Sequence, residues 1–291
     1  MRILLTGSKG QLGRCFKDRL PEDWEVIAAD SATLDITDAA AVLNMARSFQ
    51  PDAIVNAAAY TAVDKAESER EKAFTVNGTA VHNLAAAART VKARFIHIST
   101  DYVFNGLGKT PYTEASLPDP AGVYGKSKLA GELLALAAHP DSLILRTAWV
   151  FSEYGNNFVK TMLRLAAERS ELSVVNDQIG NPTYAGDLAQ AVIDMLRSPA
   201  VPRGIYHFCG DKPVSWYEFA ERIFQTAADH NPAFKTPVLR AISTEAYPTP
   251  APRPPYSVLD CSRIRTESGI EPSDWQKALG RVVEQLTEQA V

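Results

Sequence analysis

The chain has 291 residues, of which 46% are hydrophobic and 22% are charged, and its formal net charge is -4. This composition is typical of a globular protein and excludes wholesale disorder, a collagen-like fibre and a coiled-coil rod. The mild acidity argues against electrostatic capture of nucleic acid, which requires a basic face. No stretch reaches about 18 uninterrupted apolar residues, so no membrane-spanning helix is predicted.

The amino-terminal end and the cysteines point to a cytoplasmic protein. The apolar run that begins at Met1 ends at Gly7 and is too short for a secretory signal peptide. The cysteines, Cys15, Cys209 and Cys261, are far apart in the sequence, and no pair has the spacing of a metal or redox motif. We therefore expect reduced thiols in the cytoplasm.

The first half of the chain alternates short apolar runs with helical patterns. The apolar runs predict buried strands at residues 3–6, 25–29, 53–56, 94–99 and 143–145. The intervening patterns predict helices at residues 10–20, 39–49, 67–89 and 125–138, the second of them capped by Asp38. Because continuous apolar strands that alternate with helices form parallel sheets covered on both faces, we expect a Rossmann-type doubly wound α/β sheet.

The second half is less regular and predicts a smaller α+β domain. Helices are predicted at residues 157–169, 185–197, 216–228 and 273–289, and short strands at 172–175 and 204–209. Residues 248–255 hold five of the chain's 18 prolines, which excludes a helix and predicts an ordered loop or a flap. We expect one domain over residues 1–148, joined by about 185–209, and a second over residues 149–291.

A glycine-rich turn separates the first strand from the first helix. Gly7, Gly10 and Gly13 follow the spacing G-x-x-G-x-x-G in the strand–turn–helix context that a dinucleotide-binding turn requires. The first glycine permits the tight turn, the second lets the backbone approach a pyrophosphate, and the third allows the helix to pack closely. The helix N-terminus supplies free N–H groups and the positive end of its dipole. These features predict a dinucleotide site.

The choice between NADH and NADPH stays open. Asp30 lies at the end of the second predicted strand, where a carboxylate can bond the adenosine ribose 2′-hydroxyl, and this favours NAD. No Arg directly follows Asp30 to receive a 2′-phosphate, although Lys9 or Arg14 could approach one.

A tyrosine, a lysine and two hydroxyl groups form the most specific pattern. Tyr124 and Lys128 are four residues apart in a predicted helix, so their side chains lie on one face. A nearby ammonium and an oxidised nicotinamide lower the pKa of a tyrosine from its usual value near 10. Ser99 and Thr100 end a predicted strand, at the edge where doubly wound sheets bind ligands, and a hydroxyl there can polarise a carbonyl. The pattern predicts proton transfer to a carbonyl substrate.

These motifs resemble the extended short-chain dehydrogenase/reductase superfamily over essentially the whole chain. Residues 56–64 (NAAAYTAVD), 99–104 (STDYVF), 145–150 (LRTAWV) and 177–183 (DQIGNPT) look like the dTDP-4-dehydrorhamnose reductase family within it. The resemblance implies NAD(P)H-dependent reduction of the C4 keto group of dTDP-4-dehydro-β-L-rhamnose to dTDP-L-rhamnose, which supplies cell-surface polysaccharide. It also implies that the first domain binds the cofactor and the second binds the sugar nucleotide.

The resemblance, together with the glycine motif, assigns the site residues. The implied catalytic residues are Thr100, Tyr124 and Lys128. The implied cofactor-binding residues are Gly7, Gly10, Gln11, Leu12, Gly13, Asp30, Asp35, Ile36, Ala59, Tyr60, Thr61, Asn77, Tyr124 and Lys128. The implied substrate-binding residues are Thr100, Asp101, Trp149 and Arg253. Asn77 resembles the Asn that supports a proton relay in this superfamily, and the Arg253 guanidinium is suited to a diphosphate.

The first predicted helix bears on metal binding and on oligomeric state. Some members of the family form dimers around Mg²⁺ through a Glu in the first helix, where this chain has Cys15. Because a neutral thiol is a poor ligand for a hard cation, we predict no metal. A monomer and a homodimer both remain open.

Two other functions compete with the reductase. The first is a nucleotide-sugar 4,6-dehydratase or epimerase, but a dehydratase typically has an Asp-Glu pair where this chain has Asp101 followed by Tyr102. The second is a non-catalytic regulatory subunit, because that of methionine adenosyltransferase resembles the same family. The intact Thr100, Tyr124 and Lys128 favour an enzyme.

Overall fold

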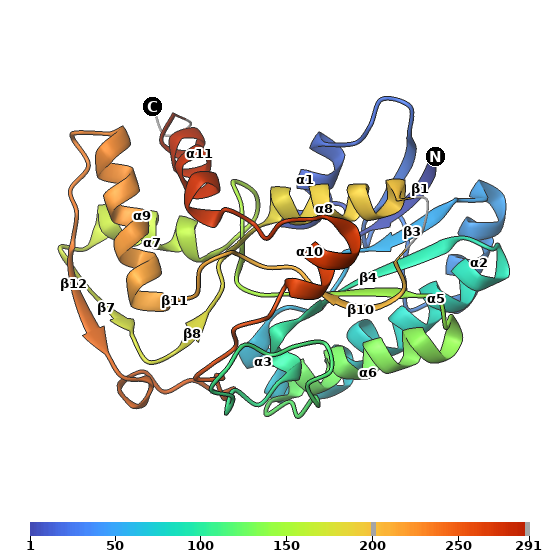
Figure 1. The fold of residues 1–291 in the computed structure, drawn as a ribbon, viewed down its shortest axis with the longest axis horizontal. Coiled ribbons are helices and arrows are strands. Elements are labelled where there is room, and N and C mark those ends of the chain that lie inside the picture. The colour runs from blue at the N-terminus through green and yellow to red at the C-terminus, as the bar shows by residue number, and fades with distance from the viewer. Residues whose placement is uncertain (199–201, 289–291) are drawn as a thin grey trace.

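The computed structural model describes residues 1–198 and 202–288, and its largest element is a six-stranded parallel sheet (Figure 1). The strand order is β10-β5-β4-β3-β1-β2. The strands are β1 (Arg2–Thr6), β2 (Glu25–Ala29), β3 (Ala53–Asn56), β4 (Arg94–Thr100), β5 (Leu143–Thr147) and β10 (Gly204–His207). The doubly wound α/β class predicted from the sequence is confirmed.

Helices cover both faces of this sheet because successive side chains of a buried strand point to opposite faces. They are α1 (Gln11–Asp18), α2 (Ala39–Phe49), α5 (Ala80–Thr90), α6 (Val123–Ala138) and α8 (Ala185–Arg197). Ile3 and Leu5 of β1 pack in one core with α1 and α8, whereas Leu4 packs in another with α2, α5 and α6. The predicted cap of α2 is present, since the Asp38 side chain accepts two backbone N–H groups of its first turn.

The single helix predicted for residues 67–89 is wrong, because the chain is interrupted there. α3 (Val63–Ser68) ends just before Glu69, and α4 (Arg70–Phe74) leads into a π-helical turn at Thr75–Thr79 before α5 begins. The Glu69 carboxylate accepts a hydrogen bond from the Tyr60 hydroxyl at 3.1 Å, so the break coincides with a tertiary contact that local helix propensity does not encode.

A second core lies beyond the sheet. The elements around it are β6 (Val150–Phe151), α7 (Phe158–Glu168), β7 (Glu171–Val175), β8 (Ile179–Gly180), β9 (Thr183–Tyr184), β11 (Val214–Ser215), α9 (Trp216–His230), β12 (Val238–Ile242) and α11 (Trp275–Glu288). α10 (Ser262–Ser268) instead packs with the sheet, since Ile264 lies in the core of α1 and α8. Helices α7, α9 and α11 bury Phe219 and Trp275 between them. The predicted end of the last helix, at residue 289, lies outside the described residues.

Besides α10, β10 and α8 of the second half also return to the sheet. β10 pairs with β5 through four residues, and α8 packs against α1. The proline-rich segment at residues 248–255 forms neither helix nor strand and reaches α3 (Figure 1), where the Ala251 N–H donates to the Asp64 carboxylate at 3.2 Å. The second half is therefore joined to the edge of the sheet through β10, to one of its faces through α8, and to α3 through the proline-rich segment.

Candidate functional site

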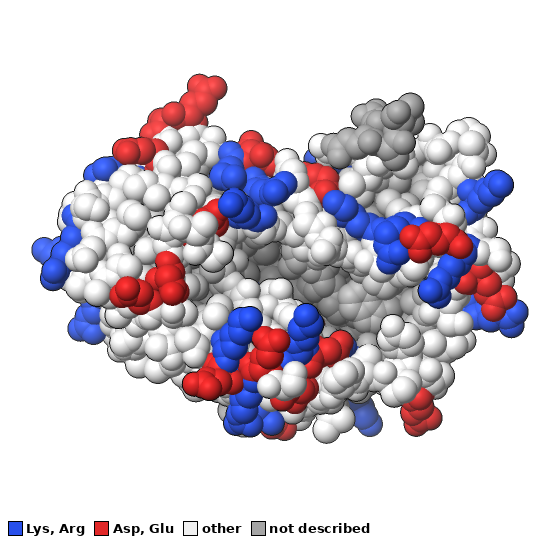
Figure 2. All heavy atoms as spheres, turned by 180° about the vertical axis from the view of Figure 1, so that it is seen from behind, with Lys and Arg blue, Asp and Glu red and all other residues white. Residues whose placement is uncertain are grey.

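A cavity of about 930 Å³ lies at the carboxyl ends of the parallel strands, where doubly wound sheets bind ligands. Seen from behind, the surface is hollowed between the two halves of the molecule, and basic and acidic side chains are interspersed around the hollow (Figure 2). Most residues predicted to bind the cofactor or the substrate line the cavity. They are Gly7, Gly10, Gln11, Leu12, Asp30, Asp35, Ile36, Ala59, Thr61, Thr100, Asp101, Tyr124, Lys128 and Trp149.

The glycine turn is shaped for a close backbone approach. Gly7 has a φ of +71°, and a Cβ there would lie 2.5 Å from the carbonyl carbon of Ala57. Gly13 does not line the cavity, but a Cβ on it would lie 2.3 Å from the Gly7 oxygen, so this glycine lets α1 close over the turn. No side chain caps the N-terminus of α1 and no acidic residue occupies its first turn. Free N–H groups beside a cavity fit the pyrophosphate of a dinucleotide.

Asp30 and Lys9 lie together at the end of β2. The Asp30 carboxylate pairs with the Lys9 ammonium and accepts the backbone N–H groups of Ala32 and Thr33, both at 3.0 Å. The hydrogen bond from Lys9 is the main cause that lowers the pKa of Asp30 to about 2. This end of the cavity therefore holds a carboxylate, which can accept a hydrogen bond from a ribose hydroxyl, and an ammonium group, which can pair with an anion.

Thr100 and Tyr124 meet at the centre of the cavity wall. The Thr100 hydroxyl donates to Asp101 Oδ1 at 2.9 Å and accepts the Tyr102 N–H at 3.2 Å. Burial raises the pKa of Tyr124 to about 12, and a hydrogen bond with Thr100 opposes that rise. Tyr124 therefore holds its proton at neutral pH, as a general acid must before it acts.

Lys128 lines the same cavity and is 2% exposed. Its Nζ donates to the Ile98 carbonyl oxygen at 2.7 Å and lies 3.3 Å from His97 Nε2. Burial lowers the pKa of Lys128 to about 8. The effect of Lys128 on the pKa of Tyr124 stays a prediction, because it also involves the bound nicotinamide.

Asp101 adds an acceptor beside Thr100. It is 2% exposed, and its Oδ2 has no hydrogen-bond partner in the described part of the chain. Burial raises the pKa of this carboxyl to about 6. Hydrogen bonding by the nearby Ser257 and Thr100 hydroxyls opposes that rise. The carboxyl therefore lies on the cavity wall among hydroxyl groups and can also accept a polar group of a ligand.

Trp149 and Trp216 stack where the two halves of the chain meet. Their ring centroids are 3.5 Å apart with an interplanar angle of 6°, and both line the cavity. A Cβ on Gly180 would lie 2.5 Å from the Trp149 ring, so a glycine at this position is needed to avoid a clash with the indole. Sequence reasoning missed Trp216, because only the tertiary structure brings it to Trp149.

Gln11 connects the glycine turn to the second half. Its Oε1 accepts hydrogen bonds from Ser152 Oγ at 3.0 Å and from Asn157 Nδ2 at 2.9 Å. Asn157 also caps α7 by accepting the Lys160 N–H. A predicted cofactor residue is thus held in place by side chains of the predicted substrate domain.

Tyr60 and Asn77 do not line the cavity. Asn77 is fully buried in the π turn, where it bonds both backbone groups of Tyr60, at 2.8 and 3.0 Å, and Ser127 Oγ at 3.0 Å. The Tyr60 hydroxyl is bonded to Glu69. In this structure Asn77 holds the loop after β3 against α6.

Arg253 also lies outside the cavity lining. Its Nη2 pairs with Asp64 Oδ2 at 2.8 Å, and its Nη1 donates to the Ala251 carbonyl at 3.3 Å. Burial raises the pKa of Tyr102, which does line the cavity, and the nearby Arg253 guanidinium opposes that rise. The guanidinium is therefore close to the cavity but engaged with α3.

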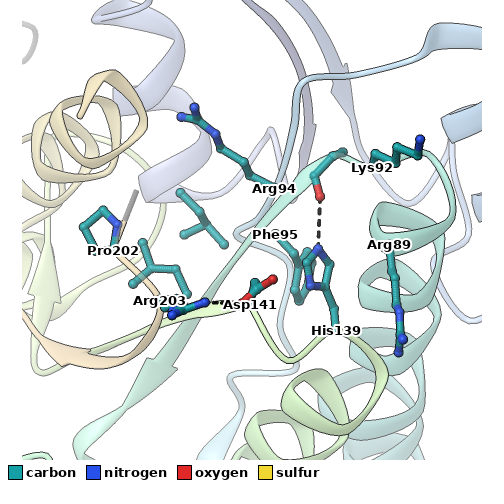
Figure 3. Close-up of a pocket in the computed structure, with 11 residues that line it drawn as sticks. Arg89, Lys92, Arg94, Phe95, His139, Asp141, Pro202 and Arg203 are labelled. Carbon is teal, nitrogen blue, oxygen red and sulfur yellow. Dashed lines mark hydrogen bonds and ion pairs between the residues drawn. The ribbon is translucent and has the colours of Figure 1, made fainter. Parts of the chain in front are cut away.

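A second cavity, of about 560 Å³, lies at the opposite edge of the sheet and is lined by basic side chains (Figure 3). Arg89 and Arg94 donate to carbonyl oxygens in the last turns of α6 and α8, at 3.1 and 2.5 Å. His139 bonds the carbonyl that precedes β4, and Arg203 pairs with Asp141. Arg89 and Arg94 thus satisfy carbonyl groups at the ends of two helices, and Arg203 is paired with a carboxylate, so these side chains have structural roles.

Cys15 packs in the core between α1 and the sheet, and burial raises the pKa of its thiol to about 12. Across residues 1–198 and 202–288, no three or more His, Cys, Asp or Glu side chains gather as a metal site. No helix in that part of the chain is long and apolar enough to span a membrane.

The fold and the site together define the class. The extended short-chain dehydrogenases/reductases combine a doubly wound sheet, a glycine turn and a Tyr-x-x-x-Lys pair at the carboxyl edge of the sheet. This chain has all three features. The family model described as RmlD substrate binding domain matches residues 1–288. The chain belongs to the dTDP-4-dehydrorhamnose reductase family, which confirms the resemblance seen in the sequence.

Individual relatives agree with this assignment. A dTDP-4-dehydrorhamnose reductase of Aggregatibacter actinomycetemcomitans is 48% identical over 97% of this chain and 98% of its own. A crystal structure of such a reductase from Clostridium acetobutylicum has a TM-score of 0.93 and 40% identity, covering 99% of this chain and 100% of its own. A crystal structure of such a reductase from Bacillus anthracis, in complex with NADP, has a TM-score of 0.92 and 38% identity. The match covers 98% of this chain and 99% of its own.

Proposed function

We propose that this protein is an oxidoreductase that reduces the C4 keto group of dTDP-4-dehydro-β-L-rhamnose to dTDP-L-rhamnose with NADPH or NADH. Family membership supports the reaction, and one observation carries it: Thr100, Tyr124 and Lys128 share a cavity with the glycine turn. The rival dehydratase would need a second carboxylate beside Asp101, where this chain has Tyr102.

The roles of the residues follow from their protonation and bonds. When bound, the reduced nicotinamide supplies the hydride that C4 receives. Tyr124 holds its proton at neutral pH and can donate it to the developing alkoxide. The Thr100 hydroxyl, which donates to Asp101 in this structure, can orient the carbonyl oxygen by turning that proton toward it. Lys128, with its pKa lowered to about 8 by burial, can exchange a proton near neutral pH and so help to restore Tyr124.

We propose that both NADH and NADPH are accepted. The Asp30 carboxylate can accept a hydrogen bond from a ribose 2′-hydroxyl, and Lys9, which is 73% exposed, can turn toward a 2′-phosphate. The relative from Bacillus anthracis was solved with NADP.

A spectrophotometric assay with the keto-sugar nucleotide tests the reaction. We expect one reduced cofactor to be oxidised for each substrate molecule converted. A dehydratase or epimerase recycles its cofactor, so product formation without net oxidation would favour that alternative. No turnover with either cofactor, together with co-purification of a synthetase, would favour a regulatory subunit.

We further propose that Arg253 leaves Asp64 to bind the substrate diphosphate. Replacement of Arg253 by Met should raise KM for the sugar nucleotide roughly tenfold to hundredfold, because a charge-assisted hydrogen bond contributes about 1.5–3 kcal/mol. The value of kcat should change little, since the guanidinium is distant from the reacting carbon in this proposal. Steady-state kinetics at saturating cofactor measure both constants.

Asp64→Asn is the matched control for this prediction. It weakens the ion pair that holds Arg253 but leaves the guanidinium in place, so KM should stay equal or fall. An equal rise of KM in both variants would show that the pair only anchors the proline-rich segment. An unchanged KM in Arg253→Met would refute the diphosphate role.

The remaining assignments are also proposals. Residues 1–148 with about 185–209 would hold the cofactor and residues 149–291 the sugar nucleotide, and the pairing of β10 with β5 supports this division. We propose a cytoplasmic enzyme that acts as a monomer or a homodimer.

A further inference from the structure

The helix that carries Tyr124 and Lys128 begins without a cap of its own. α6 starts at Val123, and Gly122 at its N-cap position has no side chain that could accept a hydrogen bond. No acidic residue occupies the first turn of the helix. The first N–H groups of a helix have no partner within it, and the side chain of the N-cap residue commonly binds one of them. The start of α6 therefore needs a partner from another element.

Glu67 of α3 supplies this partner. Its Oε1 accepts the backbone N–H of Val123 at 2.8 Å, although the two residues are 56 positions apart in the sequence. A Cβ on Gly122 would lie 2.9 Å from the same oxygen, so the carboxylate occupies the space of an N-cap side chain. A carboxylate is favoured there because it faces the positive end of the helix dipole. Glu67 thus caps α6 from a different helix.

Apolar contacts hold the same turn of α6 against its neighbours. Val123 is 6% exposed and packs in a small core with Ala66 of α3 and Ala73 of α4, and Tyr124 packs against this core. Apolar burial has no direction, so these contacts bring the turn close to α3 without fixing its orientation. A hydrogen bond requires alignment of its donor and acceptor, so the bond from Val123 to Glu67 fixes that orientation.

The cap acts on Tyr124 more than on Lys128. Tyr124 directly follows the capped residue Val123, whereas Lys128 lies one turn further into α6 and donates to the Ile98 carbonyl oxygen at 2.7 Å. Helices fray from their ends, so loss of the cap would displace the tyrosine and leave the lysine in place. A displacement of about 1 Å at a reacting group can lower turnover a hundredfold.

We propose that Glu67 is a positioning residue, which accepts the N–H of Val123 and so holds Tyr124 where it can reach the substrate carbonyl. The proposal rests on the proposed reductase function, in which Tyr124 donates the proton. Asp64, three residues before Glu67 on α3, pairs with Arg253 of the proline-rich segment at 2.8 Å. α3 therefore joins the segment proposed to bind the diphosphate to the helix that carries the proposed acid.

Hydrogen exchange of the Val123 amide, measured by NMR, tests the cap without substrate. The first N–H of a helix ordinarily exchanges fast, but the bond to Glu67 should protect this one. In Glu67→Ala its exchange should become at least about tenfold faster, while the amide of Lys128 keeps its rate. In Glu67→Gln, whose side-chain oxygen can still accept the N–H, the Val123 rate should stay within about threefold of wild type.

Steady-state kinetics test whether the cap serves catalysis. Glu67→Ala should lower kcat roughly tenfold to hundredfold, because the proton donor is displaced. The dissociation constant of the reduced cofactor, measured by fluorescence titration, should change little, because the glycine turn is untouched. Glu67→Gln should recover most of the turnover. Glu71→Ala is the matched control, since it removes an exposed glutamate of α4, and it should behave like wild type.

Three results would overturn the proposal. They are equal Val123 exchange in wild type and Glu67→Ala, unchanged kcat in Glu67→Ala, and turnover in Glu67→Gln as low as in Glu67→Ala. The Glu67 side chain is only half-buried, so the variants should fold, and thermal unfolding checks this. If Glu67→Ala does not fold, fast exchange of Val123 in the wild type would still contradict the cap. Exchange rates need no turnover, so failure of the reductase assay and failure of the cap are distinguishable.

Discussion

Replacement of Tyr124 by Phe is expected to lower kcat for keto-sugar reduction by at least about a hundredfold. The substitution removes the hydroxyl that holds a proton at neutral pH and leaves the ring in its edge-to-face contact with Tyr102, whose centroid is 5.5 Å away. The protein should therefore fold normally, and cofactor affinity should change only a few-fold. Stopped-flow or steady-state oxidation of the reduced cofactor measures the loss, and thermal unfolding checks the fold.

Tyr206→Phe is the matched control. This tyrosine lies on β10, and its hydroxyl bonds Glu267, away from the residues that line the cavity. The control should retain wild-type turnover while it loses one hydrogen bond. Wild-type turnover in Tyr124→Phe would show that another group donates the proton.

Replacement of Arg146 by Met is expected to lower the free energy of unfolding by about 3–5 kcal/mol, the cost of leaving one member of a buried ion pair without its partner. Arg146 and Glu132 are each 1% exposed and form two hydrogen bonds, at 2.9 and 2.6 Å. Ser99 Oγ, at the end of β4, donates to the same carboxylate. Denaturant unfolding of wild type and variant measures the difference.

The double variant Glu132→Gln/Arg146→Met distinguishes the cost of an unpaired buried charge from the cost of lost side-chain packing. Because it leaves no uncompensated charge in the core, most of the lost stability should return. If the double variant were as unstable as Arg146→Met alone, packing of the Arg146 side chain, whose guanidinium lies 5.1 Å from the Phe104 ring centroid, would be the larger effect.

The elements that carry the site were predictable because local patterns specify them. Apolar runs identify the strands of the sheet, and Asp38 caps α2 as its position before a helical pattern suggests. Tyr124 and Lys128 share a helix face by spacing alone. The glycine turn requires its residue types wherever it occurs, since the φ of Gly7 and the space at Gly13 admit no Cβ.

Contacts between distant segments were not predictable. Arg253 engages Asp64, which is 189 residues away, and Cys209 Sγ lies 3.4 Å from Cys261 Sγ although the sequence separates them by 52 residues. The break at Glu69 likewise depends on Tyr60. None of these pairings has a local pattern, because each depends on how whole elements pack.

The sequence by itself determined the fold class, the glycine turn and the residue types at the site, because hydrogen bonding and side-chain periodicity are local properties of the chain. Only the tertiary structure decided the protonation and partners of those residues. Lys128 is four residues from Tyr124 in the sequence, yet its amine faces His97 and Ile98 of another strand. Burial and the hydrogen bonds of neighbouring elements set the charge of a buried amine, and both exist only once the sheet and its helices have assembled.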